Sequence, residues 1–359
     1  NIAMGFYAAR CNTTGIQNTA VGFAALKLNT TGTCNTASGF YALAANTTGS
    51  DNTAVGSQSL LSNTTASYNT AIGRCALRET TTGEYNTAIG YKSLTSAVSG
   101  VKNTATGSLT LENNTGDCNT ANGYASMRLN TTGIRNTSVG FQALYTNTTG
   151  SYNTALGLNA LVSSTTASNN VAVGFYSLSE NTTGTGNTST GYKALGDNTT
   201  GTCNTASGCY ALRSNTTASY NTAYGSCALK SNTTGTSNTA VGFRAVRVTT
   251  TGDQNTGVGV DALYSNTTAD NNTAVGYRSL FSNTTGSHNT ATGVCSLHTN
   301  TTAVKNTAYG FGSLKLNTTG ACNTGIGFQS LYYNTTGASN VATGYFSLHN
   351  NTTGCFNTA

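Results

Sequence analysis

The sequence predicts an all-β fold, a parallel β-solenoid or β-roll of about 21 coils with 17 residues in each coil. One pattern, N-T-A-x-G-[FY]-x-[AS]-L-x-x-N-T-T-[GA]-x-x, runs through the whole chain, and its glycine and leucine keep a fixed register. We number its positions 1 to 17. The composition agrees, because Gly, Asn and Thr are poor helix formers, whereas Thr suits strands and Gly and Asn suit turns. A helix-turn-helix repeat is excluded, because it needs about 34 residues.

The repeat begins 21 times, first at Asn1 and last at Asn340, and only the repeat at 103–118 has sixteen residues. We find no linker, so residues 1–359 are expected to form a single uninterrupted array, interpreted as a window of a longer chain. Two strands of about five or six residues and two turns fill one repeat. Each repeat is therefore expected to form a two-strand coil, and parallel pairing at about 4.8 Å gives a rod of roughly 100 Å.

The tolerance of each position predicts which way it faces. Position 5 is Gly from Gly5 to Gly344, which indicates a positive φ or a close approach of two backbones. Small residues at positions 3 and 8 and Leu at position 9 are expected to face inward. Positions 7, 10, 16 and 17 accept many residue types and are expected to face outward. The constant Asn at position 1 predicts a ladder of side chains hydrogen-bonded from coil to coil.

Position 6 is aromatic in 13 of the 21 repeats. It is expected on the face opposite position 3, because side chains alternate along a strand. Two interpretations stay open. The rings pack over a turn of their own chain, or they form an apolar stripe that is buried against a partner chain.

Position 12 supplies Asn-Thr-Thr, an acceptor sequence for N-glycosylation, in 16 repeats. The alternative is a polar turn with stacked Asn and Thr side chains, and it is favoured because three repeats keep both threonines without the asparagine. Glycans one coil apart would also be crowded, at about 4.8 Å. The glycosylation candidates, including one from the short repeat, are Asn12, Asn29, Asn46, Asn63, Asn113, Asn130, Asn147, Asn181, Asn198, Asn215, Asn232, Asn266, Asn283, Asn300, Asn317, Asn334 and Asn351.

Six of the ten cysteines form three candidate pairs in which position 7 of one repeat is matched by the last position of another. In a two-strand coil these positions lie near opposite turns, roughly 17 Å apart, whereas a disulfide needs Cα atoms about 4.4–6.8 Å apart. Bonds between neighbouring chains are therefore the hypothesis, with unpaired thiols as the alternative. The pairs are Cys75 with Cys118, Cys203 with Cys227, and Cys295 with Cys322.

Enzyme chemistry, cofactors and metal ions are not expected. The three histidines, His288, His298 and His349, sit at variable positions, the acidic residues do not pair at a repeated position, and no C-x-x-C zinc spacing occurs. The net charge is +6, but Lys and Arg stand at variable positions, so we expect neither a basic patch nor a nucleic-acid partner. No apolar run of about 18 residues occurs, so no membrane contact is expected from these residues.

The stretches "NTAIGYKSL", "NTAVGFAAL" and "NTALGLNAL" resemble the repeats of trimeric autotransporter adhesin heads and similar arrays in phage tail fibres. The resemblance implies a β-roll, often with three chains side by side. The repeat is longer here, and the excess is the "NTTG" segment.

The expected function is that of an extracellular or surface-attached structural filament or stalk. It would associate with itself as a homo-oligomer or fibre, and glycans would coat it where the acceptor sequences are used. The alternative is the shaft or head of an adhesin or receptor-binding tail fibre. Ice binding is a lesser alternative, because the adjacent threonines at positions 13 and 14 are expected to point to opposite faces.

Overall fold

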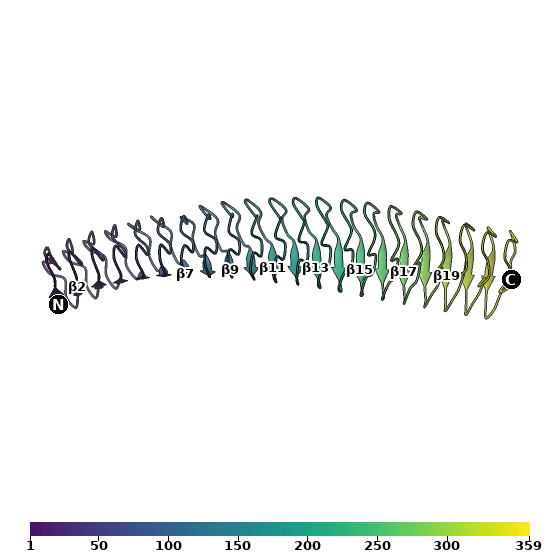
Figure 1. The fold of residues 1–359 in the computed structure, drawn as a ribbon, viewed down its shortest axis with the longest axis horizontal. Coiled ribbons are helices and arrows are strands. Elements are labelled where there is room, and N and C mark those ends of the chain that lie inside the picture. The colour runs from purple at the N-terminus through teal and green to yellow at the C-terminus, as the bar shows by residue number, and fades with distance from the viewer. The chain divides into compact units, whose positions relative to one another are not determined.

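The computed structural model describes all 359 residues and contains parallel β-strands and no helix. The chain divides into two compact segments, the N-terminal segment Asn1–Thr183 and the C-terminal segment Gly184–Ala359. Within each segment the coils stack one after another, and their strands lie side by side along one edge (Figure 1). The predicted parallel β-solenoid with 17 residues per coil is confirmed. That the whole chain is one uninterrupted array stays a prediction.

Each coil contributes one strand of three residues, at positions 2 to 4. The strands of the N-terminal segment are β1 (Ile2–Met4), β2 (Thr19–Val21), β3 (Thr36–Ser38), β4 (Thr53–Val55), β5 (Thr70–Ile72), β6 (Thr87–Ile89), β7 (Thr104–Thr106), β8 (Thr120–Asn122), β9 (Thr137–Val139), β10 (Thr154–Leu156) and β11 (Val171–Val173). Those of the C-terminal segment are β12 (Thr188–Thr190), β13 (Thr205–Ser207), β14 (Thr222–Tyr224), β15 (Thr239–Val241), β16 (Thr256–Val258), β17 (Thr273–Val275), β18 (Thr290–Thr292), β19 (Thr307–Tyr309), β20 (Thr324–Ile326) and β21 (Val341–Thr343).

Neighbouring strands pair in parallel with equal repeat positions opposite each other. Thr19 of β2 faces Thr36 of β3, and Ala20 faces Ala37. The sixteen-residue coil keeps this register, since Thr104 of β7 faces Thr120 of β8. The missing residue is therefore absorbed outside the strand.

The expected second strand of each coil is wrong. Positions 6 to 11 form a run of turns instead, because positions 7 and 9 adopt positive φ, 53° at Ala24 and 51° at Leu26. The backbone still bonds to adjacent coils, with the Leu26 N–H 2.9 Å from the Ala42 carbonyl oxygen and the Ala24 N–H 2.8 Å from that of Phe6. Coil stacking thus satisfies the backbone polar groups without strand geometry.

The core of each segment is narrow and built from three repeat positions. Ala at position 3, Ala or Ser at position 8 and Leu at position 9 are buried, as at Ala20, Ala25 and Leu26. The predicted inward face is therefore confirmed at these positions. Alanine is needed beside leucine because the short coil leaves room for only one large side chain per layer.

Glycine at position 5 meets both requirements that were expected of it. Gly22 has a φ of +125°, and a Cβ placed on it would lie 2.7 Å from the carbonyl oxygen of Gly39 in the next coil. A side chain at this position would both strain the backbone and separate the coils.

Two asparagine ladders run along each segment and meet at one carbonyl. At position 1, the Asn35 N–H donates to Asn18 Oδ1 at 3.0 Å, and Asn35 Nδ2 donates to the Gly49 carbonyl at 2.8 Å. At position 12, Asn46 Nδ2 donates to Asn29 Oδ1 at 2.7 Å and to the same Gly49 carbonyl at 2.9 Å. The predicted position-1 ladder is confirmed, and a second ladder supports the other end of the turn.

Candidate interaction surface

The position-12 asparagines lie inside the solenoid. Fourteen of the seventeen glycosylation candidates are fully buried, Asn12 and Asn351 are half-buried, and Asn113 is exposed. A glycan would be attached to Nδ2, and in Asn46 that nitrogen already donates two hydrogen bonds, to Asn29 and Gly49. The geometry therefore favours the ladder interpretation over a glycan at the buried positions.

Asn113 is exposed because the next residue takes its place in the ladder. In the short coil, Asn114 is buried and donates from Nδ2 to the Gly116 carbonyl at 2.8 Å. Two further exposed acceptor sequences, Asn271-Asn272-Thr273 and Asn350-Asn351-Thr352, were missed. A scan for Asn-x-Thr at every repeat position, rather than at position 12 alone, would have found them.

The ten cysteines are free thiols in the structure. The candidates at position 7 are partly covered, and Cys75 is buried with its Sγ 3.6 Å from Gln58 Oε1. Those that close a repeat, such as Cys118, Cys203 and Cys322, are exposed. Disulfides between neighbouring chains stay a prediction, and the exposed thiols at position 17 are the more accessible partners for them.

Threonines at positions 13 and 14 lie in a bend, so strand alternation does not apply to them. At position 13 the hydroxyl is tied to the backbone, as where Thr30 Oγ1 donates to the Thr47 carbonyl at 3.0 Å. The position-14 threonines, such as Thr31 and Thr48, are exposed. Position 14 thus gives one exposed threonine row along each segment, whereas ice binding would call for two, and the expectation that the adjacent threonines point to opposite faces stays a prediction.

Position 6 carries exposed aromatic side chains that stack from coil to coil. Phe23 is 39% and Phe40 48% exposed, and their ring centroids lie 5.5 Å apart at an interplanar angle of 20°. Position 4 adds exposed β-branched side chains such as Val55 and Ile72. The rings thus pack on one another and remain open to solvent, which keeps the partner-chain interpretation as a hypothesis.

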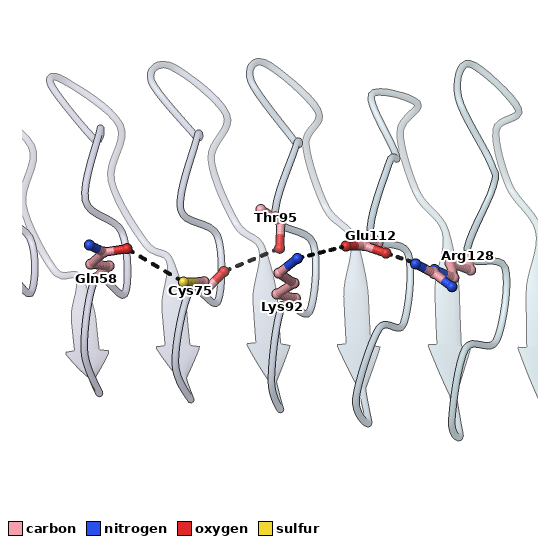
Figure 2. Close-up of polar contacts among 6 residues, drawn as sticks. All are labelled: Gln58, Cys75, Lys92, Thr95, Glu112 and Arg128. Carbon is pink, nitrogen blue, oxygen red and sulfur yellow. Dashed lines mark hydrogen bonds and ion pairs between the residues drawn. The ribbon is translucent and has the colours of Figure 1, made fainter.

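Positions 7 and 10 together form a second surface, here called the 7/10 face. Figure 2 shows part of it in the N-terminal segment, where the side chains of consecutive coils contact one another. Lys92 Nζ lies 3.6 Å from Glu112 Oε1, and Arg128 Nε donates to Glu112 Oε2 at 2.7 Å. The hydrogen bond from Arg128 to Glu112 raises the arginine pKa above its ordinary value.

The 7/10 face of the C-terminal segment follows the same plan. The Asp261 carboxylate is 2% exposed and lies 2.8 Å from Arg244 Nε and 3.6 Å from Arg278 Nε. The phenol of Tyr332 accepts a hydrogen bond from Lys315 at 3.1 Å, which raises the lysine pKa. These contacts hold the long side chains of the face in defined positions from coil to coil.

The expectation that Lys and Arg form no basic patch is wrong. Of the 16 cationic residues, 12 stand at positions 7 or 10, whereas only two of the ten acidic residues do. The two positions adjoin within a coil and between coils, since the ring of Tyr210 at position 7 has the Arg213 guanidinium of the same coil 5.3 Å and the Lys230 ammonium of the next coil 5.2 Å from its centroid. Tabulating charge by repeat position would have revealed this face.

Comparison with protein-family models and with curated proteins finds no match for this chain. Three or more His, Cys, Asp or Glu side chains do not gather anywhere in the structure as a metal site would require. No helix suited to crossing a bilayer is present.

Proposed function

We propose that the chain is a structural filament or stalk segment that works outside the cell or attached to its surface. The observation that carries the proposal is the repetition of the same three supports in coil after coil: a buried leucine and two asparagine ladders. Each coil contacts its neighbours along the stacking axis, so length grows by adding coils while the cross-section stays constant.

Labelling the protein in its native setting tests this proposal. Antibodies raised against the purified chain, with immunogold detection on intact cells that have not been permeabilised, should decorate threads or stalks at the cell surface. Gold found only after permeabilisation, within the cell interior, would contradict it.

A second candidate, the shaft of a multi-chain adhesin or tail fibre, is favoured by the exposed apolar rows at positions 4 and 6. Phe141 at 46% exposure and Val139 at 42% are examples from a single coil. Burying such side chains against a second copy would be favourable, at about 25 cal/mol for each Å² removed from water. Light scattering coupled to gel filtration measures this: a trimer supports the fibre shaft, and a monomer at all concentrations opposes it.

A further inference from the structure

We propose that the 7/10 face binds a linear anionic polysaccharide, a chain of sugars that carries sulfate or carboxylate groups. The inference extends the proposed extracellular function and rests on it for its biological setting. Three observations support it: positive charge is concentrated on this face, aromatic rings hold the cations at the surface, and stacked rings leave little room for nucleic-acid bases.

Charge is separated between the 7/10 face and the remainder of the C-terminal segment. The face holds seven cations and one acid, Asp261, whereas the remainder holds one cation, Lys305, and three acids. A net +6 therefore lies on the 7/10 face and a net −2 elsewhere on this segment. The seven cations are Lys193, Arg213, Lys230, Arg244, Arg247, Arg278 and Lys315.

Part of this charge is not neutralised within the chain. Asp261 pairs with Arg244 and Arg278, and Arg213 Nε lies 4.0 Å from Asp197 Oδ2. Lys230, Arg247 and Lys315 have no acidic partner. Burial, together with the charges of Lys315 and Arg278, lowers the pKa of His298, as expected where the local potential is positive. A row of uncompensated cations attracts a polymer of opposite charge.

Aromatic rings hold the cations at the surface. The ring of Tyr210 carries the Arg213 guanidinium at 5.3 Å and the Lys230 ammonium at 5.2 Å from its centroid. Arg278 likewise lies 5.2 Å from the centroid of Tyr277. These contacts restrict the long side chains while leaving N–H groups free to meet sulfate or carboxylate oxygens.

Stacked rings at position 10 of the same face are poorly placed to bind nucleic-acid bases. Single-stranded nucleic acid is held by stacking its bases on open aromatic faces. Here Phe281 is stacked on both sides, by Tyr264 at 5.2 Å and by His298 at 5.3 Å between ring centroids. At Phe281 the face therefore offers charge without an open stacking platform, which suits a polysaccharide better than RNA or single-stranded DNA.

A hollow on the 7/10 face of the N-terminal segment fits the same ligand. It has a volume of about 330 Å³ and is lined by Lys27, Tyr41, Ala44 and Leu61, among others. Small-molecule sites begin at about 300 Å³. An apolar floor with one cation at its rim suits a sugar ring that carries an acidic group.

Binding of fluorescent dextran sulfate to the full chain, measured by anisotropy at several salt concentrations, tests the proposal. The triple variant Arg213→Gln, Lys230→Gln, Arg247→Gln removes three cations from the 7/10 face. The matched control Lys102→Gln, Arg135→Gln, Lys305→Gln removes three from position 17 and alters the net charge equally. We expect the first variant to bind at least tenfold more weakly. Its affinity should also depend less steeply on salt, because a protein with fewer cation contacts releases fewer counterions from the polymer when it binds. The control should bind like the unmodified chain.

Three outcomes would overturn the proposal. An equal loss of affinity in both variants would show that net charge alone drives binding. Binding of neutral dextran as tight as that of dextran sulfate would show that the charge of the ligand does not matter. Tighter binding of oligo(dT) than of dextran sulfate with the same number of charges would point to nucleic acid. Circular dichroism monitors folding, and the single changes Arg213→Gln and Lys230→Gln replace the triple variant if it unfolds. The immunogold experiment tests the extracellular location and the binding assay tests the polysaccharide, so a negative result in one experiment does not affect the interpretation of the other.

Discussion

Changing Thr249 to Asn should stabilise the C-terminal segment by repairing a gap in the position-12 ladder. Thr249 is buried between Asn232 of the preceding coil and Asn266 of the following one. Its hydroxyl accepts a hydrogen bond from Asn266 Nδ2 at 3.2 Å, but Asn232 Oδ1 is buried without a partner. An asparagine amide at 249 would supply the missing donor, as asparagine does elsewhere in the ladder.

The same gap occurs wherever the ladder loses its asparagine to Thr or Ser. Asn63 Oδ1 precedes Thr80, and Asn147 Oδ1 precedes Ser164, and both oxygens are buried without a partner. A buried polar atom left without a hydrogen bond costs about 1–3 kcal/mol. We therefore expect Thr249→Asn to raise the free energy of unfolding by about 1–3 kcal/mol, since the site already fits asparagine in neighbouring coils.

Urea unfolding followed by circular dichroism measures this gain as a higher midpoint with an unchanged slope. Because repeat arrays can unfold in parts, hydrogen exchange at residues 232–266 provides the local reading. The matched control is the reverse change in an intact stretch, Asn283→Thr, which loses donors to Asn266 Oδ1 at 3.0 Å and the Gly286 carbonyl at 2.9 Å. It should destabilise by a similar amount. An unchanged or lower midpoint for Thr249→Asn would refute the argument that the open acceptor is a defect.

Four further predictions follow from the described side chains. Leu195→Ala removes a fully buried leucine and should cost about 2–5 kcal/mol, whereas Leu158→Ala, at a site 38% exposed, should cost far less in the same unfolding measurement. Because burial and nearby cations keep the folded His298 pKa below its ordinary 6.5, the unfolded chain binds the proton more readily. Stability should then fall as the pH drops through 6.5, and His298→Gln should remove part of that fall in thermal melts. Folded chain treated with an oligosaccharyltransferase should gain sugar at Asn113 and not at buried Asn29, and a glycopeptide containing Asn29 would show that the ladder opens. Non-reducing electrophoresis should show oligomers that collapse on reduction if exposed cysteines join chains, and a single monomer band in both lanes would exclude this.

The features that could be predicted from the sequence are those at positions that only one residue type can fill. Gly at position 5 is constant because a Cβ on Gly22 would meet the Gly39 backbone, and leucine at position 9 fills the only large place in the core. Asparagine at position 1 is constant because the oxygen and the nitrogen of its amide both form hydrogen bonds along the ladder, as at Asn35, although Asn306 Nδ2 has no partner. At these positions the residue type indicates its structural surroundings, so the repeated pattern predicts this part of the fold.

The number of strands per coil could not be predicted, because contacts between stacked coils determine the backbone conformation and override the conformational preference of each residue. Residues with positive φ are normally Gly or Asn, and a left-handed conformation costs other residues about 1–2 kcal/mol. Nevertheless Leu26, Ala24 and Cys34 adopt φ of 51°, 53° and 57°, and nothing in their identity indicates it. Hydrogen bonds between coils and burial of the leucine compensate for the strain, so the turns extend through positions where strand-forming sequence was expected.

The 7/10 face was hidden for a related reason. Along the chain, positions 7 and 10 hold Tyr, Gln, Lys, Asp, Cys and His in changing combinations, which reads as free variation. The coil makes each of these residues a neighbour of others one full repeat away, so Asp261 meets both Arg244 and Arg278 although each arginine lies 17 residues from it in the sequence. Variation at one position is therefore constrained by its neighbours up and down the stack. The repeat that keeps the fold constant also brings the variable positions of successive coils together on one face, so each coil adds its residues to a shared charged surface.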